Sequence, residues 1–258
     1  MFLPYKDENP TELTPVVTLG IIALNVAAWL FVQGAGADEP LTRSVCQLGL
    51  IPGELLGKVP VGAVIPLGRD PLGHLITCPN PIGPPHIATV LTSMFMHGGW
   101  LHILGNMWFL WVFGNNIEDS MGHARFVVFY LLCGVAAAAA QMLTDPRSVV
   151  PMVGASGAIS GVMGAYILLY PRVRVHTLVF LGIFVTSVAW PASVILGYWF
   201  LLQLLFGAVG TFGRVQGGTA FWAHVGGFIL GLVLIKWFAN SEYLERRRGG
   251  VLILPRDA

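Results

Sequence analysis

Apolar positions along the chain gather into separate runs, several of them long enough for helices that cross a membrane. Such a helix needs about 20 predominantly apolar residues to cross about 30 Å of hydrocarbon. The predicted spans, separated by polar or proline-rich breaks, are residues 16–33, 100–113, 126–143, 155–170, 193–209 and 220–238. We therefore expect an all-α polytopic membrane protein, a six-transmembrane-helix bundle forming one membrane domain over residues 1–258.

The first predicted span follows a polar leader. Within residues 1–15, one lysine is outnumbered by three acidic residues. Because a secretory signal peptide has a basic leader, the run that begins at Val16 is better interpreted as a retained membrane helix. Cleavage near the small residues 34–37 is the open alternative.

Residues 34–96 form a long first loop that is rich in glycine and proline. Loops of this length are usually functional or disordered, and the apolar content of this one favours a folded cap lying on the membrane. Cys46 and Cys78 both lie in it. On an extracytoplasmic loop they could form a disulfide, but the sequence does not show their distance, so the pairing stays open.

Residues 176–190 are short, β-branched and interrupted by Gly182, which fits either a seventh span or an interfacial hairpin. Basic residues distinguish the two, because they concentrate in cytoplasmic loops. They follow the second, fourth and sixth predicted spans, as Arg125, Arg172, Arg174, Lys236 and Arg246 to Arg248. The loops after the third and fifth spans hold only Arg147 and Arg214. This pattern predicts six spans, cytoplasmic termini and an interfacial segment at 176–190.

Composition agrees with a membrane protein and excludes several other classes. The 258 residues are 55% hydrophobic and 10% charged, and the mean hydropathy is +0.72; no ordinary soluble domain has this composition. The net charge of +1 gives no basis for binding nucleic acid. The three cysteines, which include Cys133, show no C-x-x-C pair and no zinc-ligand spacing.

Two predicted spans carry stripes of small residues. At about 100° per residue, one stripe of the fourth span contains Ser156, Gly157, Ser160, Gly161 and Gly164. The corresponding stripe of the sixth span contains Ala220, Ala223, His224, Gly227 and Gly231. In lipid, small residues let helix backbones approach closely, so we expect these two stripes to pack together. A packing motif that happens to contain a serine is the competing explanation.

The fourth span is too short to cross the membrane alone. Its sixteen residues reach about 24 Å at about 1.5 Å per residue, so it must begin below the surface. The loop before it then has to dip, which is tolerated only where protein buries the backbone or water reaches it. We therefore expect a water-filled cavity at Ser156.

Polar side chains from three even-numbered spans meet at a similar depth. Ser156, His224 and His102 lie near the starts of their helices, and Asn106 follows His102 by one turn. Close packing would bring the Ser156 hydroxyl within about 2.6–3.2 Å of the imidazole of His224, as in an activated nucleophile. An ionisable residue inside a membrane is costly, so function is the default hypothesis.

Four motifs are similar to those of the rhomboid family. They are H-x4-H-x3-N at His97, His102 and Asn106, G-x-S-G from Gly154 to Gly157, A-H-x2-G-x3-G from Ala223 to Gly231, and G-x3-E from Gly114 to Glu118. Their order and spacing across residues 16–238 resemble a rhomboid intramembrane serine protease.

The resemblance implies a role for each matching residue. Ser156 would be the nucleophile and His224 the base of a Ser–His dyad. His102, Asn106, Gly154 and the Ser156 amide would stabilise the oxyanion. His97 would order the loop end by hydrogen bonds, Gly157, Gly227 and Gly231 would be structural, and Glu118 would support the cytoplasmic loop.

The resemblance also implies an activity and partners. The reaction would be endopeptidase cleavage of transmembrane helices of single-pass membrane proteins, through an acyl-enzyme and without cofactor or metal. Cleavage would follow a small residue near a helix-weakening sequence. The expected surroundings are membrane lipid, with no nucleic acid, in the inner membrane of a bacterium. The active site would open to the extracytoplasmic side.

Two departures from the family pattern stand out. Some relatives carry a Trp-Arg pair in the first loop, which is missing here. Some carry an aromatic residue one turn after the nucleophile to brace the histidine, where this chain has Ser160. What orients His224 is therefore open.

Two other classes compete with a serine protease. A membrane metalloenzyme could use His97, His102 and His224, but the chain lacks H-E-x-x-H and an intramembrane carboxylate ligand. A non-catalytic relative or a small-solute channel is the third class. Inactive rhomboid relatives usually lack the serine or the histidine, and both are present here.

Overall fold

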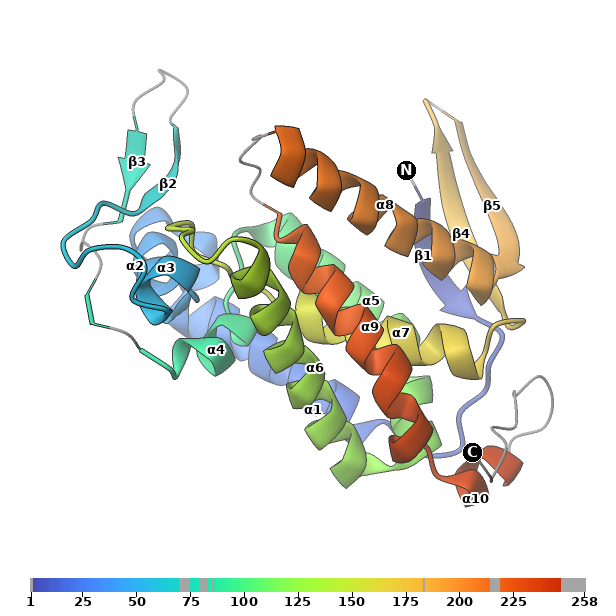
Figure 1. Cartoon of the computed structure of the whole chain (residues 1–258). Coiled ribbons are helices and arrows are strands. Elements are labelled where there is room, and N and C mark those ends of the chain that lie inside the picture. The colour runs from blue at the N-terminus through green and yellow to red at the C-terminus, as the bar shows by residue number, and fades with distance from the viewer. Residues whose placement is uncertain are drawn as a thin grey trace.

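The structure is a computed structural model that describes residues 2–69, 75–78, 83–84, 86–182, 184–213 and 219–246. Its long helices are α1 (Val16–Ala27, continued by a π-helical turn Ala28–Val32), α5 (Trp100–Met121), α6 (His123–Thr144), α7 (Ser156–Leu169), α8 (Ala192–Gly213) and α9 (Phe221–Phe238). Short helices are α2 (Asp38–Leu48), α3 (Pro52–Leu55), α4 (Thr89–Thr92) and α10 (Ser241–Arg246). Strands are β1 (Phe2–Asp7), β2 (Pro66–Arg69), β3 (Leu75–Thr77), β4 (Arg174–Leu181) and β5 (Phe184–Pro191). The long helices form a bundle, with α2, α3 and the β2–β3 hairpin at one end and the β1–β4–β5 sheet at the other (Figure 1).

The described residues include three helices that are long and apolar enough to cross a membrane. They are α6, residues 192–211 of α8, and α9. The helical run Val16–Val32 and α7 are shorter apolar helices. The chain is thus a polytopic helical membrane protein, and its count of six spans stays a prediction. Arg214, Arg247, Arg248 and parts of the 34–96 loop, on which some predictions rest, lie outside the described residues.

Helix α5 is longer than the predicted span 100–113. It continues through the polar residues after Phe113 to Met121, and it ends at Gly122, whose φ of +81° is in the left-handed region. The predicted polar connection from Gly114 to Arg125 is therefore wrong. The helix can continue there because its polar side chains are buried with partners of their own.

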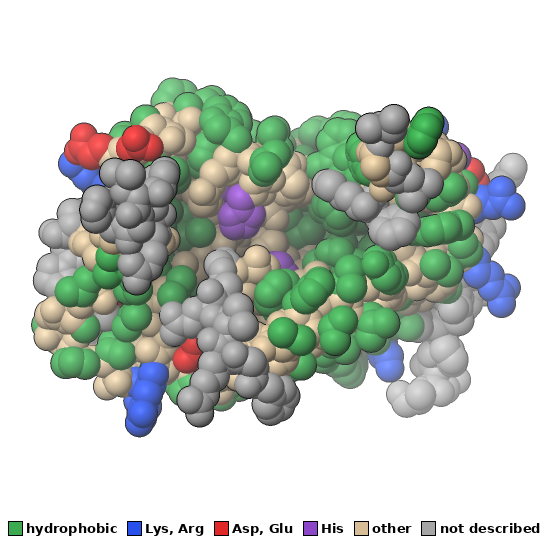
Figure 2. Space-filling view, turned by 90° about the horizontal axis from the view of Figure 1, so that it is seen from above, with side chains coloured by type: hydrophobic (Ala, Val, Ile, Leu, Met, Phe, Trp, Pro, Cys, Tyr) green, Lys and Arg blue, Asp and Glu red, His purple; other side chains and the backbone are tan. Residues whose placement is uncertain are grey.

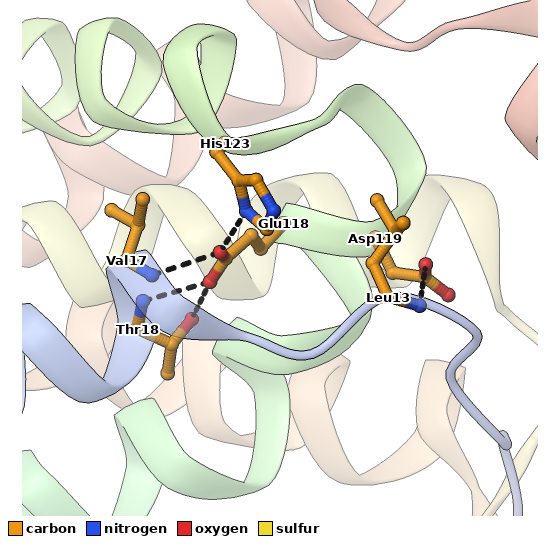
Figure 3. A network of polar contacts seen from close by, with 6 residues as sticks. All are labelled: Leu13, Val17, Thr18, Glu118, Asp119 and His123. Carbon is orange, nitrogen blue, oxygen red and sulfur yellow. Dashed lines mark hydrogen bonds and ion pairs between the residues drawn. The ribbon is translucent and has the colours of Figure 1, made fainter.

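The carboxylates of Glu118 and Asp119 on α5 accept hydrogen bonds from the segment 12–18 (Figure 3). The Glu118 carboxylate accepts hydrogen bonds from the amides of Val17 and Thr18 at 2.9 and 2.7 Å and from the Thr18 hydroxyl at 2.7 Å. It also contacts His123 Nδ1 at 2.6 Å. The first N–H groups of a helix have no partner within the helix and favour negative charge. The carboxylate therefore caps α1 and ties it to the corner between α5 and α6.

Helices α7 and α9 are in backbone contact, as the two small-residue stripes predict. A methyl group added to Gly227 would overlap the carbonyl oxygen of Gly157, and one added to Gly231 would overlap that of Gly161. Likewise, a methyl on Gly164 would overlap the carbonyl oxygen of Phe228. The predicted pairing of these helices is confirmed, and it depends on residues without side chains.

The described parts of the long first loop are folded, as predicted, and contact the segment that leads into α7, while the position of this cap on the membrane stays a prediction. Its cysteines Cys46 and Cys78 form a disulfide, which settles the pairing that the sequence left open. Leu50 and Met152 exchange two backbone hydrogen bonds of 2.9 and 2.8 Å. The amide of Gly154 donates to the carbonyl of Ser93 at 2.9 Å. The cap thus provides partners for the backbone of the loop that precedes α7.

The segment 176–190 lies in a β-hairpin, and its strands belong to a three-stranded antiparallel sheet of order β1–β4–β5. Strand β4 alternates, with Val175, Thr177 and Val179 buried, which is the pattern of a half-buried strand. The N-terminal segment, for which no element was expected, supplies β1 and pairs with β4. The all-α prediction therefore omits this sheet, because a short polar segment becomes a strand only where another strand offers its edge.

The contact between α7 and α9 predicts that Gly231→Ala destabilises the protein. The added methyl group would overlap the Gly161 backbone, and overpacking typically costs about 1–3 kcal/mol. The melting temperature of the purified protein in detergent should fall. In the matched control Gly20→Ala, the methyl group would meet no atom within 4 Å, so the melting temperature should hold or rise. Equal melting temperatures for the two variants would contradict a tight contact.

Candidate active site

Ser156 is the first residue of α7, and its hydroxyl faces α9. Its Oγ lies 2.8 Å from Nε2 of His224, the fourth residue of α9. The two side chains come from helices whose glycines permit backbone contact, so the short distance follows from the packing. A serine hydroxyl at this distance from an imidazole can transfer its proton and attack an electrophile.

The second ring nitrogen of His224 also has a partner. Its Nδ1 lies 2.8 Å from Oε1 of Gln203 on α8, and the indole of Trp199 packs beside the imidazole at a centroid distance of 5.7 Å. Ser160, which occupies the expected bracing position, instead donates its hydroxyl to the carbonyl of Ser156 at 2.6 Å. The contacts to the Nδ1 side of the imidazole therefore come from α8, and Ser160 of α7 supplies none of them.

His102 and Asn106 converge on Gly154, just before the nucleophile. A methyl group added to Gly154 would lie 2.7 Å from His102 Nε2 and 3.5 Å from Asn106 Nδ2. His102 Nδ1 accepts a hydrogen bond from the amide of Gly98 at 3.2 Å, so in the neutral ring Nε2 carries the hydrogen. Both groups are thus hydrogen-bond donors directed at one small space.

Two features show that donors at this place are free to bind a ligand. Asn106 is buried, and its Nδ2 has no hydrogen-bond partner among the described residues. Among the described residues, no side chain caps the first turn of α7, whose N–H groups lack partners within the helix. Gly154 keeps the space open, and its φ of +123° is one that L-amino acids rarely adopt. The arrangement can stabilise negative charge on an oxygen atom.

His97 is fully buried and packs edge-on against His102, with ring centroids 5.1 Å apart. Its hydrogen bonds come from the backbone. Its amide donates to Gln33 Oε1, and its carbonyl accepts from Gln33 Nε2, both at 2.8 Å. Neither imidazole nitrogen has a hydrogen-bond partner among the described residues. His97 is thus held by the end of the first span and presents its ring to His102.

The remaining residues assigned from the sequence divide into two groups. Gly157, Gly227 and Gly231 lie in the contact between α7 and α9 that brings the serine to the histidine. Glu118 lies near the other end of α5, where it caps α1. It is therefore not among the residues that surround Ser156.

A cavity of about 1480 Å³ adjoins these side chains. Ser156, His224, His102 and Asn106 all contribute to its wall. Figure 2 shows a hollow in the molecular surface with histidine side chains inside it. A cavity therefore adjoins Ser156 as predicted, and its filling by water stays a prediction.

Sequence reasoning missed two amides. Gln203 lies in the middle of an apolar run, where a buried amide needs a partner, and this polarity was a usable signal. Gln33 is the last residue of the predicted first span, and nothing in the sequence pairs it with His97, which is 64 residues away. Only the tertiary structure shows that Gln203 pairs with His224 and Gln33 with His97.

The histidines do not gather as metal ligands would. Within the part of the chain that the structure describes, no three His, Cys, Asp or Glu side chains form a group that could hold a metal ion. The metalloenzyme alternative, with His97, His102 and His224 as ligands, therefore has no supporting geometry there.

Comparison with known proteins identifies relatives over most of the chain. The rhomboid domain family model matches residues 84–241. Rhomboid protein 1, mitochondrial, of Saccharomyces cerevisiae is 30% identical over 164 residues, which cover 62% of this chain and 44% of the relative. Rhomboid-like protein 11, chloroplastic, of Arabidopsis thaliana is 29% identical over 159 residues, or 58% of this chain and 52% of the relative.

A bacterial relative matches a shorter segment. The putative rhomboid protease YdcA of Bacillus subtilis is 35% identical over 78 residues, which cover 30% of this chain and 39% of the relative. The chain thus spans about half the length, or less, of these curated relatives.

The contact between Ser156 and His224 predicts an unusually reactive serine. A fluorophosphonate probe should label Ser156, and Ser156→Ala should abolish the labelling. His224→Ala should slow it by about 10²-fold or more, because general-base assistance is lost. Mass spectrometry of the labelled peptide identifies the site. Ser120→Ala removes a buried serine near the other end of α5 and should leave labelling unchanged, whereas undiminished labelling of His224→Ala would exclude an activated hydroxyl.

Proposed function

The chain belongs to the rhomboid family, and we propose that it is an intramembrane serine endopeptidase that cleaves transmembrane helices of single-pass membrane proteins. The observation that carries this proposal is the 2.8 Å contact between Ser156 Oγ and His224 Nε2. It occurs beside a cavity and beside Asn106 Nδ2, a donor that has no hydrogen-bond partner among the described residues. A structural serine or a channel lining has no need for this combination.

The proposed reaction proceeds through an acyl-enzyme. His224 Nε2 takes the proton of the Ser156 hydroxyl while the oxygen attacks a peptide carbonyl, and it then protonates the leaving amine. A water molecule, activated in the same way, releases the acyl group. No acidic side chain is required in this scheme, which is a Ser–His dyad.

The donors around Gly154 would act on the oxygen of the attacked carbonyl. His102 Nε2–H, Asn106 Nδ2–H and the Ser156 amide would bind it as its negative charge develops. Because these groups lie on two helices, α5 and α7, that are already in place, little reorganisation accompanies the reaction. Each such donor typically contributes about 10² to 10³ in rate.

The orientation in the membrane is also part of the proposal. The chain is a multi-pass membrane protein, and we propose a bacterial inner membrane with both termini in the cytoplasm and the cavity opening on the opposite side. The distribution of basic residues supports this orientation. The disulfide in the cap supports it too, because disulfides persist in oxidising compartments.

The proposed function predicts cleavage of single-span reporters by the purified protein in lipid. Among a panel of reporter helices, those with a small residue near a helix-weakening sequence should be cut. Ser156→Ala and His224→Ala should each fold but lose detectable cleavage, and a chelator should have no effect. Gel analysis and mass spectrometry of the products measure this. Cleavage retained by Ser156→Ala would end the serine hypothesis, and loss of cleavage with the chelator would favour a metalloenzyme.

The oxyanion assignment predicts a kinetic effect for Asn106→Ala. The variant should lower kcat by about 10²-fold or more with little change in KM, because the donor acts on charge that develops in the transition state. The matched control is Asn25→Ala on α1, which removes another buried asparagine, one that donates to the carbonyl of Ile21. Control kinetics equal to those of the unmodified protein, together with a slow Asn106 variant, would support the assignment. An unchanged kcat for Asn106→Ala would contradict it.

A further inference from the structure

The strongest feature that the proposed mechanism does not use is the amide of Gln203. It lies on the apolar helix α8, and the residue is only 8% exposed. A polar group buried in an apolar setting is costly unless it is hydrogen-bonded. Gln203 meets this requirement at both ends of its amide, and one of its partners is His224.

The two contacts define which way the amide points. Gln203 Nε2 donates to the carbonyl oxygen of Trp199 at 3.4 Å. A carbonyl can only accept, so the NH₂ end must face Trp199. In the opposite orientation, two oxygen atoms would face each other. Oε1 is therefore the atom that lies 2.8 Å from His224 Nδ1.

This orientation determines the protonation pattern of His224. Because Gln203 Oε1 carries no hydrogen, His224 Nδ1 must donate the hydrogen in that contact. In a neutral imidazole the other nitrogen is then an acceptor, and it is Nε2 that lies 2.8 Å from Ser156 Oγ. The ring is thus held in the tautomer that can accept the proton of the serine.

We propose that Gln203 is a positioning residue that selects the reactive tautomer and orientation of His224 by accepting a hydrogen bond from its Nδ1, without itself taking a proton. This inference rests on the proposed function. The sequence pattern made Ser160 the expected position for a brace, but its hydroxyl is used by the carbonyl of Ser156. Trp199, one turn before Gln203 on the same helix, adds a ring contact to the imidazole.

A neutral amide suits this position for a physical reason. In soluble serine proteases a buried carboxylate holds the histidine. A carboxylate on α8 would have to be buried in an apolar helix inside a membrane, where charge is expensive. The amide accepts the same hydrogen bond without the charge, at the cost of stabilising the protonated imidazole less.

Three variants test the proposal by steady-state kinetics on a cleaved reporter. Gln203→Leu keeps the size but removes the acceptor, and it should lower kcat by about 10- to 100-fold with KM unchanged. This is a smaller loss than the roughly 10⁴-fold that follows loss of the correct tautomer in a carboxylate triad. Gln203→Glu keeps an acceptor and should retain kcat within about tenfold. Thr211→Val is the matched control, because it also removes a hydrogen bond between α8 and α9, from Trp222 Nε1 at 2.9 Å, without touching His224.

The pH dependence separates positioning from a structural role. In Gln203→Glu the carboxylate should favour the protonated imidazole, so the acidic limb of the kcat/KM profile should move to higher pH. His102 is the titratable side chain, within the described part of the chain, that interacts electrostatically with His224. The variants leave it unchanged. An unmoved limb, or kcat of Gln203→Leu equal to that of the unmodified protein, would overturn the proposal.

A direct measurement needs no variant at position 203. In the unmodified protein labelled with ¹⁵N-histidine, the His224 resonances, assigned by comparison with His224→Ala, should show a protonated Nδ1 and an unprotonated Nε2. The opposite tautomer would overturn the proposal even if Gln203→Leu failed to fold. Cleavage by Ser156→Ala would defeat the proposed function, whereas Ser156-dependent cleavage that is unaffected by Gln203→Leu would defeat only the role of Gln203.

Discussion

The backbone contact between α7 and α9 is the constraint on which the site depends. The carbonyl oxygens of Gly157 and Gly161 lie so close to Gly227 and Gly231 that neither of the latter two could carry a methyl group. In a membrane, apolar side chains gain little by leaving lipid for one another, so helices associate through close packing of this kind. The same contact sets the distance between Ser156 and His224. Helix packing and the chemistry of the site therefore have a single origin, and the competing explanations of the small-residue stripes, packing and catalysis, do not exclude each other.

Around this contact, polar groups are satisfied by partners from distant parts of the chain. The side-chain amide of Gln33 hydrogen-bonds to the backbone N–H and C=O of His97. The side-chain amide of Gln203 hydrogen-bonds to Nδ1 of His224. The cap supplies backbone partners to the loop before α7. A buried polar group without a partner costs free energy. Each of these hydrogen bonds therefore favours one position of the residue that it joins. Asn106 Nδ2 and the two imidazole nitrogens of His97 are exceptions within the described residues. Asn106 Nδ2 is a group for which a reaction intermediate would provide the missing partner.

At the end of the bundle away from Ser156, two buried carboxylates hydrogen-bond to the N-terminal segment. Glu118 caps the first turn of α1 and contacts His123, while Asp119 accepts hydrogen bonds from the amides of Glu12 and Leu13. These contacts fix the start of the chain against the corner between α5 and α6. They also explain why α5 extends beyond its apolar residues: its last polar turns are buried against the N-terminal segment. Rigidity at this end supports the helix that carries His102 and Asn106 at the other.

The sequence by itself determined the helical membrane class, most of the helix positions, the pairing of two glycine stripes and the family. These follow from local periodicity, from run lengths compared with the thickness of a bilayer, and from short motifs. Only the tertiary structure decided that Cys46 bonds to Cys78, that the N-terminal segment becomes a strand on β4, and that Gln203 reaches His224. In each of these cases the partner is remote in sequence. A local sequence pattern can indicate that a buried polar group or a cysteine needs a partner, but it does not identify the distant residue that folding places beside it.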